Sequence, residues 1–212
     1  MHTELYLIRH GETIWNLEKR FQGQIDSPLT ENGREQAQIL GKFLQGMSFD
    51  VLITSDLGRA AETAQILNSF LNIPVFIEEP ILRERNFGIF HGLNKEEAEK
   101  KYPQEAALIW STNADAAVPR GESKNQLMQR VQRFLDELPI RYPGKRILAV
   151  THGGVVNTII RIVLRIPVEA PRRFKLPNTG LNIFVYQENE WFLRAMNIIC
   201  PLNNRQIYDD TI

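Results

Sequence analysis

The sequence predicts an α/β fold, with a mainly parallel central sheet and helices on both of its faces. Three short, continuous apolar runs suit strands that are buried on both faces. They are Leu5–Ile8, Val51–Ile53 and Ile147–Val150. Amphipathic segments lie between them, and this alternation of strands and helices is typical of a sheet with helices on both sides.

Four segments are predicted to be helices. The first begins after Thr30, a suitable N-cap, and repeats apolar residues at helical spacing as far as Leu44. The others cover residues 57–70, Ser123 to about Arg141, and Val155 to Arg165, each ending shortly before a proline. Two late strands, Asn182–Tyr186 and Trp191–Ile198, are predicted on either side of a turn at Glu188 and Asn189.

The segment from about residue 82 to residue 122 interrupts the alternation. It is rich in glycine, asparagine and other polar residues, with short helical stretches near residues 95–101 and 104–110. We therefore expect a single domain over residues 1–212 that carries an insertion over the sheet edge. The pattern leaves open whether this insertion is a lid or a surface excursion without a role.

Composition excludes several classes of protein. Lys plus Arg equals Asp plus Glu at 25 each, so a nucleic-acid partner is not expected. No apolar run has the length of a membrane span, and the first residues lack the pattern of a secretory signal. The single cysteine excludes an internal disulfide. These features predict a cytoplasmic protein without membrane contact.

Reactive side chains follow each of the three apolar runs. Arg9 and His10 follow the first, Arg59 lies one helical turn beyond the end of the second, and His152 and Gly153 follow the third. Ligands of open α/β sheets bind at the carboxyl ends of the strands. We therefore expect these residues to converge on one point.

Two arginines and two histidines at one point are suited to phosphoryl transfer. Arginine presents a planar fork of donors to phosphate oxygens, and a neutral histidine nitrogen can attack phosphorus. Glycine turns let backbone N–H groups approach an anion closely. Each residue alone has a plainer explanation, such as a solvated strand end or a surface position on a helix. Because three strand ends all supply residues suited to phosphate, the plainer explanation is less favoured for the group as a whole.

A metal site is the first alternative for His10 and His152. Their neighbours are arginine and glycine rather than carboxylates, and cationic neighbours disfavour a bound cation. The other two histidines, His2 and His91, lack a ligand-like spacing. We expect neither a metal nor a cofactor.

The ordered motifs of the chain resemble those of the histidine phosphatase superfamily, which has the phosphoglycerate mutase-like fold. The resemblance covers most of the sequence, and the ordered set is far more specific than any single motif. The matching stretches are Arg9-His10-Gly11-Glu12-Thr13 with Trp15-Asn16, Phe21-Gln22-Gly23, Asp26 to Thr30 with Gly33, Ser55 to Ala60 with Thr63-Ala64, Leu82 to Gly88, Gly121-Glu122-Ser123, and Thr151-His152-Gly153-Gly154.

The resemblance implies a role for each residue. His10 would be the nucleophile, and Arg9, Arg59 and His152 would hold the phosphoryl oxygens. Glu84 would be the general acid and then the base that activates water; without the resemblance, its plain interpretation is a surface ion pair with a neighbouring arginine. Further binding groups would be Asn16, Gln22, Gly23 and Gly153. Glu12, a second carboxylate beside the nucleophile, is expected to be structural.

The family contains hydrolases and mutases. Mutases of this family carry an arginine pair after a tryptophan, whereas Ser111 and Thr112 follow Trp110 here. The sequence therefore favours a phosphatase of the bacterial branch that acts on a small phosphorylated metabolite, with a phosphoglycerate mutase and a non-catalytic phospholigand-binding protein as alternatives. The oligomeric state stays open, a homodimer included.

Several other residues are weaker candidates for shaping the substrate pocket. Aromatic and polar side chains of the insertion are the first group, and a cluster of basic residues that would attract anionic substrates is the second. They are Phe87, His91, Tyr102, Trp110 and Arg120, and then Arg172, Arg173 and Lys175.

Overall fold

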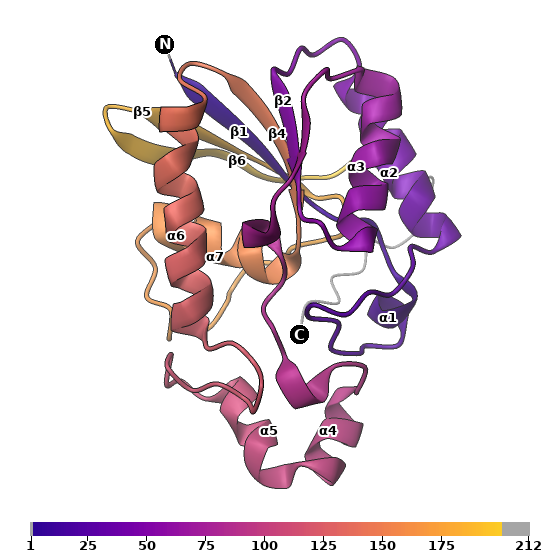
Figure 1. The fold of residues 1–212 in the computed structure, drawn as a ribbon, viewed down its shortest axis with the longest axis vertical. Coiled ribbons are helices and arrows are strands. Elements are labelled where there is room, and N and C mark those ends of the chain that lie inside the picture. Colours follow the sequence, from indigo (N-terminus) through magenta and orange to yellow (C-terminus); the bar gives the residue numbers. More distant parts are fainter. Residues whose placement is uncertain (1, 201–212) are drawn as a thin grey trace.

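The computed structural model describes residues 2–200, which form a six-stranded sheet with helices on both faces (Figure 1). The strand order is β3-β2-β4-β1-β5-β6. The pairs among β1 to β4 are parallel, whereas β5 and β6 pair antiparallel, so the predicted mainly parallel sheet is confirmed. The strands are β1 (Thr3–Arg9), β2 (Val51–Thr54), β3 (Phe76–Glu78), β4 (Arg146–Thr151), β5 (Leu181–Gln187) and β6 (Glu190–Ile198).

The three predicted apolar runs lie inside β1, β2 and β4, at the centre of the sheet. Alternate residues of each strand contribute to two separate apolar cores, as Leu5 and Tyr6 do in β1. The two late strands and the turn between them are also where the sequence places them. The short edge strand β3 was not predicted, because three residues beside a proline carry too little pattern.

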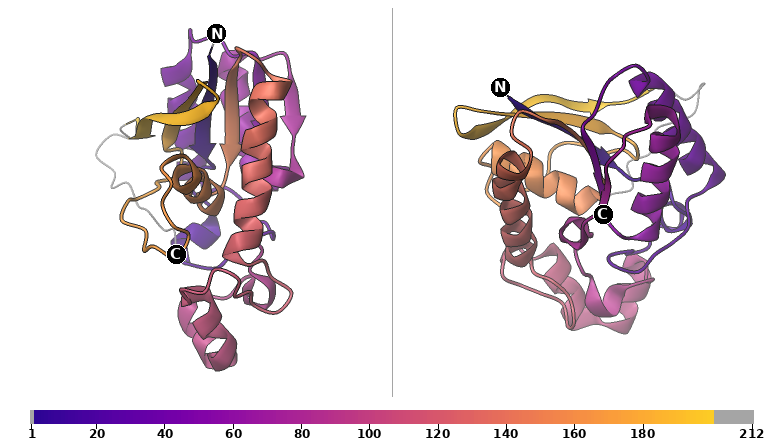
Figure 2. Two further views of the ribbon diagram at one scale, coloured as in Figure 1. Left: turned by 90° about the vertical axis from the view of Figure 1, so that its left-hand side faces the viewer. Right: turned by 45° about the horizontal axis from the view of Figure 1, so that its top comes forward.

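Helices cover both faces, as predicted (Figure 2). Helices α2 (Glu31–Leu44) and α3 (Gly58–Leu71) pack against one face of the sheet. Helices α6 (Lys124–Arg141) and α7 (Gly153–Val163) pack against the other. Helix α7 begins two residues before the predicted Val155, directly after the strand-end histidine. No helix among residues 2–200 has both the length and the apolar character needed to cross a membrane.

Residues 82–122, which we call the cap, extend beyond the carboxyl ends of the strands (Figure 1). The insertion therefore lies over the edge of the sheet that the carboxyl ends of its parallel strands form. The reason is that the start of the segment is tied to two central strands, since Glu79 N–H donates to Thr54 O at 2.8 Å and Thr151 Oγ1 donates to Leu82 O at 2.7 Å.

The cap packs with Phe21, from the loop after α1, in a small third apolar core around Phe90. Both helical stretches that the sequence predicts in it are present. The short elements of this region and of the loop after β1 are α1 (Ile14–Leu17), η1 (Pro80–Leu82), η2 (Gly88–Phe90), α4 (Lys95–Lys101) and α5 (Pro103–Trp110).

The start of α2 packs tightly against the loop that follows β1. Thr30 caps the helix by accepting from Gly33 N–H at 2.9 Å, and its own N–H donates to Glu12 O at 2.9 Å. A Cβ atom on Gly33 would lie 2.1 Å from Glu12 O, and one on Gly11 would lie 2.5 Å from Gly33 O. Glycine therefore stands where a capping box would have glutamate, because the loop after β1 occupies that space.

We expect Gly33→Ala to destabilise the protein by about 1–3 kcal/mol, because the added methyl group meets backbone atoms that cannot turn aside. Urea unfolding would measure this change. Gln38→Ala, at an exposed position of the same helix, is the control and should change the free energy of unfolding by less than about 0.5 kcal/mol. Equal stability of the two variants would contradict the packing argument.

Candidate active site

His10 lies at the carboxyl end of β1 and is only 3% exposed. Its Nδ1 is 2.7 Å from Gly11 O. Because a carbonyl oxygen can only accept, Nδ1 carries the ring proton and Nε2 carries the lone pair of the neutral ring. The local backbone thus selects the tautomer in which Nε2 can act as a nucleophile.

His152 follows the neighbouring strand β4. The parallel register pairs Arg9 with Thr151, so the next residue of each strand places the two imidazoles side by side, with ring centroids 5.2 Å apart. His152 is fully buried, and its Nε2 lies 2.8 Å from Ser55 Oγ at the end of β2. Three adjacent strand ends therefore meet at one point, as the sequence predicts.

Arg59, in the first turn of α3, is 2% exposed, so the alternative of a surface residue is wrong. Its guanidinium donates to Asp26 Oδ1 at 2.9 Å and to Gly23 O at 2.6 Å. Arg9 is equally buried and donates from Nη1 to Leu176 O at 2.6 Å. Backbone carbonyls thus help to fix both cations, and Asp26 also pairs with Arg59.

Burial and these cations act on both histidines. Burial, then Arg59, then Arg9 hold the pKa of His10 well below its ordinary value of 6.5. The pKa of His152 is also well below 6.5, first because of burial and then because of Arg59. A lowered pKa favours the neutral ring, so both imidazoles stay uncharged into the acid range.

Glu84 lies at the start of the cap, where its carboxylate meets the first turn of α7. Oε2 accepts from Gly154 N–H at 2.9 Å, and Oε1 accepts from Arg85 N–H at 2.7 Å. A Cβ atom on Gly154 would lie 2.1 Å from Oε1, so the carboxylate needs a glycine there. Arg83 pairs with Asp56 rather than with Glu84, and Arg85 Nε donates to Glu122 O.

A cavity of about 560 Å³ joins these groups to the cap. His152 lies beside His10 but is fully buried. The other predicted site residues all line the cavity, which brings the two arginines, the nucleophile and the carboxylate together. They are Arg9, His10, Asn16, Gln22, Gly23, Arg59, Glu84 and Gly153.

Hydrogen bonds to the side-chain oxygen of Asn16 fix the orientation of its amide. Oδ1 accepts from Thr13 N–H and from Thr13 Oγ1, each at 3.0 Å, in the capping box of α1. The Nδ2 amide group of Asn16 is therefore the part that can donate to a ligand in the cavity.

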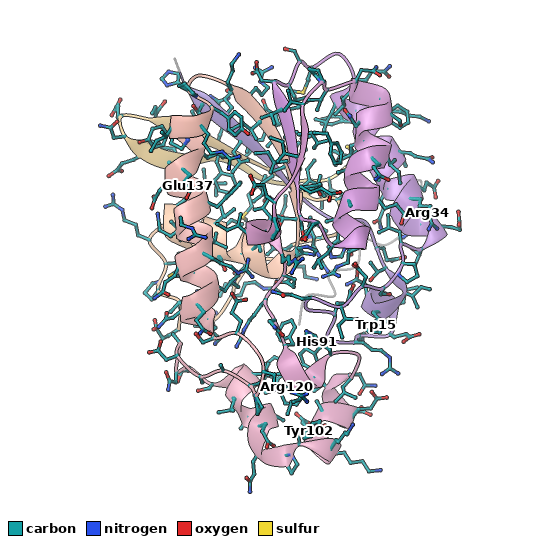
Figure 3. The ribbon with its side chains drawn as sticks, viewed as in Figure 1. Trp15, Arg34, His91, Tyr102, Arg120 and Glu137 are labelled. Atoms are coloured by element: carbon teal, nitrogen blue, oxygen red, sulfur yellow. The ribbon has the colours of Figure 1, made fainter. Side chains whose placement is uncertain are left out.

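The cap residues that were candidates for the pocket divide into two groups. Phe87 and Trp110 line the cavity, whereas the labelled side chains of His91, Tyr102 and Arg120 in Figure 3 do not contribute to its wall. His91 instead connects the cap to the loop after α1, since its Nε2 accepts from Gln24 N–H at 3.3 Å and from Phe87 N–H at 3.2 Å.

The basic cluster that the sequence suggests also divides into two groups. Arg172 lines the cavity, whereas Arg173 and Lys175 do not.

Glu12 has the structural place expected of it, since its Oε1 accepts from Thr30 Oγ1 at 2.7 Å. Among residues 2–200, no three or more side chains of His, Cys, Asp or Glu gather closely enough to hold a metal ion.

Two positioning residues support the site from a distance. Asn178, in the loop before β5, donates from Nδ2 to His10 O at 2.8 Å. Thr63 of α3 accepts from Gly11 N–H at 3.0 Å and donates to Arg59 O at 2.7 Å. Thr63 belongs to a motif that carries the family resemblance, whereas nothing near Asn178 in the sequence indicates that it meets a residue 168 positions earlier.

Residues 5–199 match the family model described as the histidine phosphatase superfamily (branch 1). The chain belongs to this superfamily. It is 36% identical over 188 residues to a protein of Serratia proteamaculans named probable phosphoglycerate mutase GpmB, covering 89% of this chain and 87% of that protein.

Solved structures of the superfamily have the same fold. YhfR of Bacillus stearothermophilus superposes with a TM-score of 0.84 at 33% identity, covering 91% of this chain and 96% of its own. The α-ribazole phosphatase of Shigella flexneri gives 0.84 at 30% identity, covering 95% and 100%. The predicted fold and family are thereby confirmed, while the relatives carry the names of both phosphatases and mutases.

We expect the ring resonances of His10 and His152 to show no protonation until the pH is well below 6.5. Removing a neighbouring cation makes the charged ring less unfavourable, so Arg9→Gln should raise both pKa values. An NMR titration of the histidine rings would measure this shift. Arg120→Gln, at an exposed turn, is the matched control, and titration of His10 at its ordinary pKa in the wild type would contradict the argument.

Proposed function

We propose that the protein is a metal-independent phosphatase that hydrolyses small phosphate monoesters through a phosphohistidine on His10. The observation that carries this proposal is the His10 ring itself. Its Nδ1 donates to Gly11 O, its Nε2 lone pair is available, and its pKa is lowered first by burial and then by Arg59 and Arg9. This arrangement favours a neutral nucleophile beside a place for an anion.

In the first step, Nε2 of His10 attacks phosphorus while the bond between phosphorus and the leaving oxygen breaks. Arg9 and Arg59 balance the charge on the phosphoryl oxygens. Ser55 Oγ accepts from Leu57 N–H, so its own hydroxyl proton can be donated to Nε2 of His152. The proton of the neutral His152 ring is then on Nδ1, from which it donates to a phosphoryl oxygen. Protonated Glu84 gives its proton to the leaving oxygen, which departs as an alcohol.

In the second step, the Glu84 carboxylate takes a proton from water, and the resulting hydroxide attacks phosphorus. The bond between phosphorus and Nε2 breaks, which releases inorganic phosphate and restores neutral His10. The donation from Nδ1 to Gly11 O stabilises the positive charge that the ring carries while it is phosphorylated. Protein charge alone fills the role that a metal has in other phosphoryl transfers.

The residues that follow Trp110 in the cavity wall favour hydrolysis over a mutase reaction. Ser111 and Thr112 occupy the wall at that point, so the arginine pair that mutases of this family carry there is absent. Phosphatases among the similar solved structures support the same choice. The relatives named probable phosphoglycerate mutase keep the mutase reaction as the second candidate.

We expect phosphate release from some members of a monoester panel to continue in chelator and to fall by about 10⁴-fold or more in His10→Ala. The panel contains p-nitrophenyl phosphate, phosphoserine, 3-phosphoglycerate, sugar phosphates and α-ribazole phosphate. His2→Ala, which removes an exposed histidine, is the control.

Loss of activity in chelator, or full activity of His10→Ala, would contradict the proposal. Interconversion of 2- and 3-phosphoglycerate that depends on 2,3-bisphosphoglycerate, in place of phosphate release, would indicate the mutase. Binding of monoesters without any turnover would indicate a phospholigand-binding protein.

We expect the loss of kcat/KM in Glu84→Gln to depend on the basicity of the leaving group. A general acid matters most when the leaving oxygen is basic, so kcat/KM for 3-phosphoglycerate should fall by about 10²–10⁴-fold. The fall for p-nitrophenyl phosphate, whose leaving group needs little protonation, should be much smaller. Glu12→Gln is the matched control and should affect both substrates equally, and equal factors in Glu84→Gln would refute the acid role.

A further inference from the structure

The cavity continues beyond the phosphoryl site into an outer part with two unlike walls. One wall is apolar and comes from the loop after α1 and from the cap. Its members are Phe21, Phe87, Ile109 and Trp110. The other wall carries cations from the cap, from α6, from α7 and from the loop after α7, namely Arg85, Lys124, Arg161 and Arg172.

Glu84 and Glu122 act on Arg85, whereas Glu169 is the carboxylate that acts on Lys124 and Arg161. The cations lie close enough to act on each other. Burial, then Arg85 and Arg161, lower the pKa of the Lys124 ammonium, whereas Glu169 raises it. Burial and Arg172 likewise lower the pKa of Arg161, and again Glu169 acts in the opposite direction. The surroundings of Lys124 and Arg161 are therefore positively charged.

Hydrogen bonds fix two of these cations but leave their charge in place. Lys124 Nζ donates to Ser111 O at 2.8 Å, and Arg161 donates to Pro167 O at 2.6 Å and to Ala170 O at 2.8 Å. A carbonyl oxygen offers a dipole rather than a full negative charge, so each side chain is positioned while its field still reaches the cavity.

Arg20, another cation of the cavity wall, gives an internal comparison. Its guanidinium pairs with Glu18 and Glu97, each at 2.6 Å, so two carboxylates offset its charge within the protein. These ion pairs explain the presence of Arg20 in the cavity wall without any ligand. Lys124 and Arg161, by contrast, share one carboxylate, Glu169, which leaves a place for a negative charge supplied by a ligand.

We propose that the substrate carries a second anionic group at the end remote from the transferred phosphoryl group, and that Lys124 and Arg161 bind it. The spacer between its two charged ends lies along Phe87 and Trp110 on the apolar wall. The inference rests on the proposed function and narrows its substrates to monoesters with a distal carboxylate or a second phosphate. Lys124 and Arg161 are thus specificity-determining residues.

Matched substrate pairs test this charge requirement. The first pair is 4-carboxyphenyl phosphate and its neutral amide, 4-carbamoylphenyl phosphate, and the second, shorter pair is 3-(phosphonooxy)propanoate and its amide. 1,4-Phenylene bisphosphate tests a distal phosphate. We expect kcat/KM of the wild type to favour the charged member of at least one pair by about tenfold, the size of one charge-assisted hydrogen bond.

Two variants assign the preference to the outer cations. In Lys124→Gln, which can still donate to Ser111 O, the ratio of charged to neutral substrate should fall to near one. In Glu169→Gln, which removes the competing carboxylate, the ratio should rise. Lys42→Gln removes the same charge from an exposed position of α2 and should keep the wild-type ratio. A purely structural role of Lys124 would leave the ratio unchanged.

Calorimetric binding of the same pairs to His10→Ala separates this inference from the proposed function, because binding needs no turnover. Tighter binding of the charged members supports the second anion site even if no hydrolysis is found. Equal binding of charged and neutral members, together with equal kcat/KM in the wild type, overturns the inference while any phosphate release leaves the phosphatase proposal intact.

Discussion

The site depends on the burial of two arginines beside a histidine that has no charge of its own. Arg9 and Arg59 are almost fully enclosed, and backbone carbonyls take up several of their donors. A cation out of water is costly unless an opposite charge approaches it. Burial and then the field of these arginines lower the pKa of His10, so one buried arrangement both attracts an anion and maintains the neutral nucleophile that would attack it.

The sheet explains how this arrangement is held. Parallel strands place the residues after β1, β2 and β4 at one edge, and the register of β1 with β4 brings the imidazoles together. Thr63 then links the loop after His10 to the first turn of α3, which carries Arg59. Movement of either element would change the distance between nucleophile and cation, so packing and electrostatics are coupled at this point.

The sequence was most informative where chemistry and periodicity coincide. Strand-end residues such as His10 and His152 could be predicted, because a buried apolar run leaves little choice about where it ends. Asn178 could not, because its contact with His10 O closes a long loop and no local pattern encodes it. The position of the cap was also inaccessible, since it depends on Leu82 O meeting Thr151 across the sheet.

Chemistry and selectivity come from different parts of the chain. The strand ends supply a cation pair that fits any phosphoryl group, and these residues carry little information about the rest of a substrate. The cap, α6, α7 and the loop after α7 supply the outer wall, where Lys124 and Arg161 are fixed by hydrogen bonds to loop carbonyls. Because such loops tolerate substitution better than buried strands, a change of substrate needs no change in the phosphoryl site. Relatives that differ in substrate can therefore share the phosphoryl chemistry proposed for His10.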